Sequence, residues 1–298
     1  MKLRSLCLII LMILALFCGC ASANQPTQIA ATTLPVYQFT SMLCEGTNLQ
    51  VTRLITENVS CLHDYSLQVS QLQAIESAQN IVQSGAGLEE FLEDVLSGAQ
   101  YVIDSSAEIN IISCAHGEHD EHGDEHDHHG HSHEYDPHIW LSPKNAKIMA
   151  QNICSSLIQQ FPAYQSTFET NLSNLLLQLE QLQTYGEEQL SDLSCRELIT
   201  FHDGFAYFAE AFGLTILEAV EEESGSEASA QELIHLIQMV QEHNLPAIFT
   251  ETNGSTSSAQ VISAETGTQI YSLDMAMAGE DYFESMYHNI DTVKEALG

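Results

Sequence analysis

The chain has 298 residues, of which 44% are hydrophobic, so it is long enough for about two domains with a sizeable core. Acidic residues number 41 against 7 lysines and arginines, and the formal net charge is −34. Such a surface repels phosphate groups, which argues against nucleic acid as a partner and disfavours anionic lipid surfaces. The acidity by itself indicates a highly soluble surface with a weak attraction for cations.

The first segment has the pattern of a bacterial export signal. Lys2 and Arg4 precede an apolar run at residues 6–17, which is 12 residues long. A membrane-spanning helix needs about 20 residues, so this run fits the hydrophobic region of a secretory signal instead. Gly19 followed by Cys20 resembles a lipobox and predicts a diacylated Cys20, whereas residues 21–23 offer an alternative cleavage site. We expect an extracytoplasmic lipoprotein, at the cell surface or in the periplasm.

Short strands and helices alternate on both sides of one long helical segment. Strands are expected at residues 28–33, 49–55, 80–83, 101–104, 197–201, 214–219, 247–250 and 269–273. Helices are expected at residues 35–44, 67–77, 88–96, 143–161, 162–193, 205–212, 230–243, 257–266 and 282–297. This alternation is typical of parallel, doubly wound α/β sheets. The length of the helix at 162–193 indicates a connector between two lobes.

A histidine-rich loop precedes the long helices. Between residues 116 and 133 the chain has 8 histidines, 6 acidic residues, 3 glycines and 1 serine, and no apolar side chain that could pack. Imidazoles with ordinary pKa values are free to bind metal at neutral pH, so low-affinity zinc capture is one interpretation and weak adventitious binding is the other. The histidines are His116, His119, His122, His126, His128, His129, His131 and His133.

Five further side chains form a candidate metal site. His202, Glu251 and Asp274 each come directly after an expected strand, and His63 and His138 lie in loops. Ligands of open α/β sheets bind beyond the carboxyl ends of the strands, so these groups are expected at one edge. Each taken singly is more often a surface or turn residue. Three imidazoles with one carboxylate suit Zn²⁺, whereas Mn²⁺ would be expected to use more oxygen ligands.

The sequence around these residues resembles a known family. Four blocks occur in order: HDY at 63–65, DPHIWLSP at 136–143, HDGFAYF at 202–208 and SLD at 272–274. Together with GAGLE at 85–89 and IFTE at 248–251, they resemble the high-affinity zinc-uptake solute-binding proteins of bacterial ABC importers, over about residues 28–298. The chain departs from the family pattern at Ser66-Leu67, Ser142 and Met275.

The resemblance implies a fold, a ligand set and partners. The fold would be two α/β lobes, each a mainly parallel sheet flanked by helices, joined by one long rigid helix, with the metal in the cleft between the lobes. The metal ligands would be His63, His138, His202 and Asp274, with Glu251 behind them or as an alternative ligand. Related manganese binders place a Glu where His202 stands, so Zn²⁺ is favoured over Mn²⁺. The protein would be a monomer that performs no catalysis and serves an ABC permease with its ATPase.

The implied domain boundaries are a signal peptide at 1–19, a tether at 20–27, a first lobe at 28–161 with the histidine-rich loop at 115–134, a linker helix at 162–193 and a second lobe at 194–298. Two other functions remain open. An extracytoplasmic zinc hydrolase would use Glu251 as its general base, and a metal-buffering or cell-adhesion lipoprotein would act through the loop. The five cysteines after Cys20 have no pairing that the sequence can assign; they are Cys44, Cys61, Cys114, Cys154 and Cys195.

Overall fold

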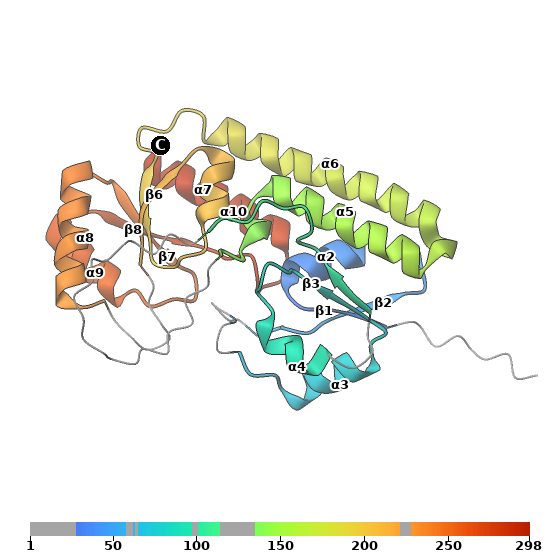
Figure 1. The fold of residues 1–298 in the computed structure, drawn as a ribbon. Coiled ribbons are helices and arrows are strands. Elements are labelled where there is room, and N and C mark those ends of the chain that lie inside the picture. The colour runs from blue at the N-terminus through green and yellow to red at the C-terminus, as the bar shows by residue number, and fades with distance from the viewer. Residues whose placement is uncertain (1–27, 58–61, 63–64, 97–100, 114–134, 221–227) are drawn as a thin grey trace, which may run out of the picture.

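The computed structural model describes residues 28–57, 62, 65–96, 101–113, 135–220 and 228–298 (Figure 1). The expected signal peptide and tether with Cys20, His63, and the eight histidines of the loop lie outside the described residues. Within the described residues, no helix combines the length and the hydropathy that crossing a membrane requires.

Two four-stranded parallel sheets form the framework. The first consists of β1 (Gln28–Ala31), β2 (Gln50–Arg53), β3 (Asn80–Gln83) and β4 (Tyr101–Asp104), in the order β2-β1-β3-β4. The second consists of β5 (Glu197–Thr200), β6 (Thr215–Ala219), β7 (Ala247–Glu251) and β8 (Gln269–Leu273), in the order β6-β5-β7-β8. Both sheets share one strand order, although no repeat is visible in the sequence.

The helices of the first half are α2 (Leu34–Leu43), α3 (Val69–Ser77), α4 (Glu93–Leu96) and α5 (Pro143–Gln160). The longest helix, α6 (Gln165–Gln189), leads to the second half, which contains α7 (Ala206–Phe212), α8 (Ala230–His243), α9 (Ser257–Thr266) and α10 (Tyr282–Leu297). Short 3₁₀ turns lie at Glu90–Leu92, Ile139–Leu141 and Pro162–Tyr164.

Two expected helices differ from the structure by more than two residues at an end. The segment expected to be helical at 88–96 starts as a 3₁₀ turn, and the segment expected at 162–193 starts as one and ends its α-helix at Gln189. Pro162 has no backbone N–H, so it cannot continue the hydrogen bonds of α5. At the C-terminal end of α6, the side chains of Ser191 and Asp192 compete for backbone hydrogen bonds. By contrast α5 starts as expected, because Ser142 accepts a hydrogen bond from the N–H of Asn145 and Pro143 is preset for the first turn.

One hydrophobic core joins the two halves. It includes Phe39 of α2, Ile153 of α5, Leu179 of α6, Phe249 of β7 and Ile290 of α10, each at most 1% exposed. Figure 1 shows α5 and α6 side by side along one edge, with α6 reaching from the first sheet to the second. The two lobes are therefore connected by packed helices as well as by the chain itself.

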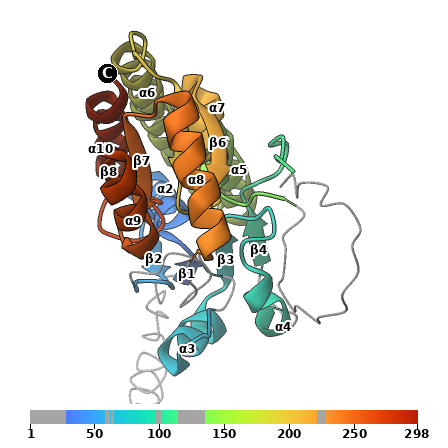
Figure 2. The ribbon, with the colours of Figure 1, turned by 90° about the vertical axis from the view of Figure 1, so that its left-hand side faces the viewer.

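A smaller core lies at the outer side of the second sheet, where Leu236 of α8 and Ile262 of α9 pack on Ile199 and Ile248. Figure 2, seen from that end of the molecule, places α8 and α9 nearest the viewer. These helices cover the face of the second sheet that α10 and α7 leave free.

Three cysteines are free thiols in the structure: Cys44, Cys154 and Cys195. Burial raises the pKa of Cys44 to about 12 and that of Cys154 to about 11. Both thiols are therefore protonated and unreactive at neutral pH. Cys61 and Cys114 lie outside the described residues.

Candidate metal site

His138 is fixed by a neighbouring carboxylate. It precedes the turn Ile139–Leu141 and is only 3% exposed. Oδ1 of the buried Asp136 accepts a hydrogen bond from the backbone N–H of His138 at 2.9 Å and lies 2.7 Å from its Nδ1. A carboxylate oxygen accepts the Nδ1 proton, so the Nε2 lone pair of His138 is left to bind a metal.

His202 also has a carboxylate near its Nδ1, at a distance longer than a hydrogen bond. It follows β5 by two residues and is 17% exposed. Its Nδ1 lies 3.6 Å from Oε2 of Glu251, a residue that is 5% exposed. The sequence pattern predicted that Glu251 follows its strand, but β7 extends through Glu251, so the carboxylate is held by the sheet itself.

The two imidazoles converge through their other nitrogens. Nε2 of His138 and Nε2 of His202 are 3.5 Å apart, and the ring centroids are 5.2 Å apart in an edge-to-face arrangement. Two nitrogens on a tetrahedral zinc, each about 2.0–2.1 Å from the metal, are about 3.3–3.4 Å apart. The observed separation is thus close to that of two ligands of one zinc ion.

Gly204 packs directly against this pair. A Cβ atom at residue 204 would lie 2.5 Å from Cε of Met275, 2.8 Å from Cδ2 of His202 and 3.0 Å from Nδ1 of His138. A Cβ atom there would displace the His202 ring and press on the His138 ring, so the close packing requires glycine. The sequence reasoning assigned no role to Gly204 or to Asp136, although both lie in the blocks that carry the family resemblance.

Asp274 is held separately, just beyond β8. Its Oδ1 accepts a hydrogen bond from the N–H of Ala276 at 2.7 Å, and its Oδ2 accepts one from the hydroxyl of Ser285 at 3.2 Å. The buried side chain of Asn289 bonds both the N–H and the carbonyl of Asp274. Asn289 is a supporting residue that the sequence reasoning did not identify.

The structure brings together His138, His202 and Glu251 from the predicted set. Among the described residues, no group of three or more His, Cys, Asp or Glu side chains is arranged to hold a metal ion, so the contribution of Asp274 stays a prediction. His63 lies outside the described residues. The other described histidines, His235, His243 and His288, are exposed on helices.

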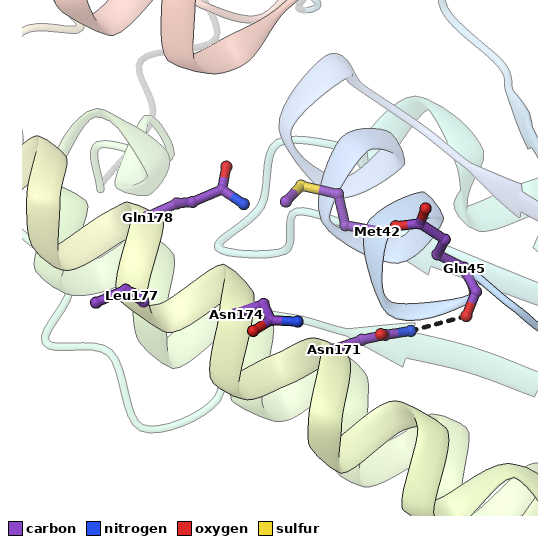
Figure 3. A pocket seen from close by; sticks show the side chains of 6 residues that line it. All are labelled: Met42, Glu45, Asn171, Asn174, Leu177 and Gln178. Carbon is purple, nitrogen blue, oxygen red and sulfur yellow. Dashed lines mark hydrogen bonds between the residues drawn. The ribbon is translucent and has the colours of Figure 1, made fainter.

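A pocket elsewhere on the molecule has a different character. It lies between α2 and α6, where Asn171 Nδ2 donates a hydrogen bond to the carbonyl of Glu45 (Figure 3). Its lining has no histidine and consists of Met42, Glu45, Asn171, Asn174, Leu177 and Gln178. The pocket therefore does not belong to the candidate metal site.

Two parallel-sheet lobes joined by a long helix, with a histidine pair contributed by both halves, define a two-lobed solute-binding protein of the metal-binding class. Over residues 29–296 the chain matches the ZnuA family, described as the periplasmic component A of the zinc-uptake complex, and it belongs to that family. The predicted family and the predicted two-lobed α/β fold are thus confirmed.

Related proteins agree with this assignment. A crystal structure of ZnuA superposes with a TM-score of 0.78 at 29% identity, over 91% of this chain and 99% of that one. A ZnuA deletion mutant with zinc bound gives 0.77 at 29% identity, over 92% and 99%. The zinc-binding lipoprotein AdcA of Streptococcus pneumoniae (strain ATCC BAA-255 / R6) is 27% identical over 283 residues. The aligned residues cover 92% of this chain but only 56% of AdcA, so the chain spans about half the length of that relative.

Proposed function

We propose that this protein captures Zn²⁺ outside the cytoplasmic membrane and delivers it to an ABC permease with its ATPase. The observation that carries the proposal is the Nε2–Nε2 separation of 3.5 Å between His138 and His202, with a carboxylate beside the Nδ1 atom of each ring. Carboxylate–histidine pairs are the usual support of zinc ligands because they fix the tautomer and raise the basicity of the ring. The zinc-binding relatives support the same metal.

The proposed ligands are His63, His138, His202 and Asp274. Each oxygen of Asp274 accepts one hydrogen bond from the chain, and a carboxylate oxygen has a further lone pair that a metal can use. Three nitrogen ligands and one oxygen favour Zn²⁺ over Mn²⁺, in agreement with the Irving–Williams order.

A binding role accounts for the site better than hydrolysis does. The hydrolase alternative needs Glu251 as a general base next to an open metal position. Oε2 of Glu251 instead lies beside Nδ1 of His202, the ring nitrogen that does not face His138. In the proposed function Glu251 orients a ligand and no chemistry takes place.

The remaining parts of the chain serve delivery to the same site. The excess of acidic residues attracts divalent cations weakly. The eight loop histidines bind additional zinc with lower affinity and pass it to the cleft. We propose that diacylated Cys20 anchors the protein, as a monomer, at the outer face of a bacterial membrane.

Zinc titration by calorimetry tests the proposal with three variants of the mature protein. His138→Ala should weaken the tight site at least tenfold, which is about 1.4 kcal/mol or more, because a buried and pre-oriented ligand is lost. Removal of all eight loop histidines should leave the tight site intact and abolish only weaker equivalents. His235→Ala, on the exposed face of α8, is the control and should match the unmodified protein.

The opposite pattern would contradict the cleft site. If removal of the loop histidines eliminates tight binding while His138→Ala retains it, the protein is a metal buffer that acts through its loop.

A further inference from the structure

The segment that follows Asp274 is bound by the first half of the chain. The carbonyl of Met275 accepts a hydrogen bond from the indole N–H of Trp140 at 2.7 Å. The carbonyl of Met277 accepts one from the backbone N–H of Leu34 at 3.1 Å and one from the Arg53 guanidinium at 3.3 Å. We refer to residues 275–279 as the Asp274 strap.

Arg53 makes the tightest of these contacts. It is the last residue of β2, and its Nη1 donates to the carbonyl of Gly279 at 2.6 Å while its Nη2 donates to Met277. The planar guanidinium can hold two carbonyls at once, and a charged donor makes stronger hydrogen bonds than a neutral one. The bonded residues are more than 220 positions apart in sequence, so this contact connects the two halves of the molecule.

The start of α10 is attached to the same half. Gln38 of α2 donates to Oδ2 of Asp281 at 3.1 Å and accepts from the N–H of Tyr282 at 2.7 Å. The hydroxyl of the fully buried Tyr282 donates to the carbonyl of Trp140 at 2.8 Å. The strap is therefore anchored to the first lobe at both of its ends.

The strap also has a backbone that its surroundings must hold in place. Ala276 has φ of +51°, a left-handed conformation that is unfavourable for a residue with a Cβ atom. This conformation allows the N–H of Ala276 to point at Oδ1 of Asp274. Arg53 holds Met277, the residue that follows Ala276, so its contacts stabilise the turn that orients the carboxylate.

From this arrangement we propose that Arg53 is a positioning residue for metal capture. Its two hydrogen bonds hold the Asp274 strap against the first lobe, and so they fix the position of the Asp274 carboxylate relative to His138. Loss of these bonds loosens the carboxylate and speeds release of the metal. This inference rests on the ligand set of the proposed function.

The test compares Arg53→Met with a matched control, Arg196→Met. Arg196 also bonds backbone carbonyls, those of Leu190, Ser191, Phe212 and Gly213, but none of these belongs to the Asp274 strap. Both variants should lower the Tm of the mature protein. Only Arg53→Met should speed zinc release to a chelator, by about tenfold or more, and alter the visible absorption of the Co²⁺-loaded protein, which reports coordination geometry.

Two further variants complete the design. Arg53→Lys keeps a charged donor but lacks the planar fork that reaches two carbonyls in fixed directions, so its release rate should fall between those of the unmodified protein and Arg53→Met. The effects of Asp274→Asn and Arg53→Met should be non-additive, because both act through one carboxylate.

The results separate the two proposals. If the unmodified protein lacks a tight zinc site, the proposed function fails and the inference fails with it. If that site is present, but Arg53→Met and Arg53→Lys match Arg196→Met in release rate and Co²⁺ absorption, only the role of Arg53 is overturned. Additive effects of Asp274→Asn and Arg53→Met would overturn it in the same way.

Discussion

At the scale of a single residue, a substitution at Gly204 tests whether close packing around the two imidazoles matters for zinc binding. In Gly204→Ala the new methyl group would lie 2.5 Å from Cε of Met275 and 2.8 Å from Cδ2 of His202, so the His202 ring must shift as well as the flexible Met275 side chain. We expect zinc affinity, measured by competition with a chelator, to fall at least tenfold. The control is Gly267→Ala, where φ is +78° but a Cβ would meet no atom within 4 Å. This control should lose stability and keep its zinc affinity, and equal affinities for both variants would contradict the close packing of the site.

Glu89 is a buried carboxyl outside the metal site. Its side chain is 5% exposed and accepts hydrogen bonds from the hydroxyl of Thr32 and from the N–H groups of Ser84 and Gly85. Burial raises its pKa from 4.5 to about 7 despite these three donors. Between these pH values the folded protein keeps a proton that the unfolded chain has lost, so the stability from this group is present below pH 4.5 and is lost as the pH rises to about 7.

Glu89→Gln should therefore flatten the pH dependence of folding. The free energy of unfolding of the unmodified apo-protein, measured in denaturant, should fall between pH 5 and pH 8 by up to about 3 kcal/mol more than that of the variant. The comparison of the two proteins removes the contributions of all other titrating groups. Parallel pH profiles for the two would show that Glu89 does not titrate in this range.

At the scale of elements, α6 contains one glycine that its packing requires. A Cβ at Gly186 would lie 2.2 Å from Cε1 of Phe212, the last residue of α7. Alanine is usually better than glycine inside a helix by about 1 kcal/mol, but overpacking a core costs about 1–3 kcal/mol. Gly186→Ala should lower the free energy of unfolding, and Phe212→Leu in the same chain should restore part of it. A stabilised single variant would contradict this packing.

Helix ends were predictable where a local cap fixes them. The predicted helices at 230–243, 257–266 and 282–297 match α8, α9 and α10. Ser229 forms a capping box with Glu232, Gly267 ends α9 in the left-handed conformation, and Asp281 accepts from two N–H groups of α10. The C-terminus of α6 was overestimated because its apolar pattern continues through Leu190 and Leu193 after the helix has ended.

At the scale of the whole molecule, the proposed delivery of zinc to a permease requires that the chain be held near the membrane. The described residues contain no helix suited to span a membrane, and the apolar run at 6–17 is too short to do so. Two acyl chains on Cys20 would anchor the protein stably, whereas one chain binds only marginally. Mass spectrometry of the mature protein should find an acylated Cys20 as the first residue. An unmodified chain that starts at Asn24 would show cleavage after Ala23 and secretion instead.

The sequence alone determined the fold class and the family, and it named the candidate ligands, which stay predictions. Hydrophobic periodicity and helix caps are local patterns. They therefore predict strands and helices without knowledge of the residues that these elements contact in the folded protein. The blocks around His138, His202 and Asp274 were also visible, because the residue types that bind zinc are few and each block follows a strand or a loop.

Only the tertiary structure decided how these parts act together. Sequence spacing cannot show that the Nε2 atoms of His138 and His202 are 3.5 Å apart, or that Gly204 packs against both rings. Nor can it show that Arg53 binds the segment after Asp274 across the molecule. These contacts join residues that are far apart in the chain. Which of such residues meet depends on the packing of the whole core, and no local sequence pattern encodes that packing.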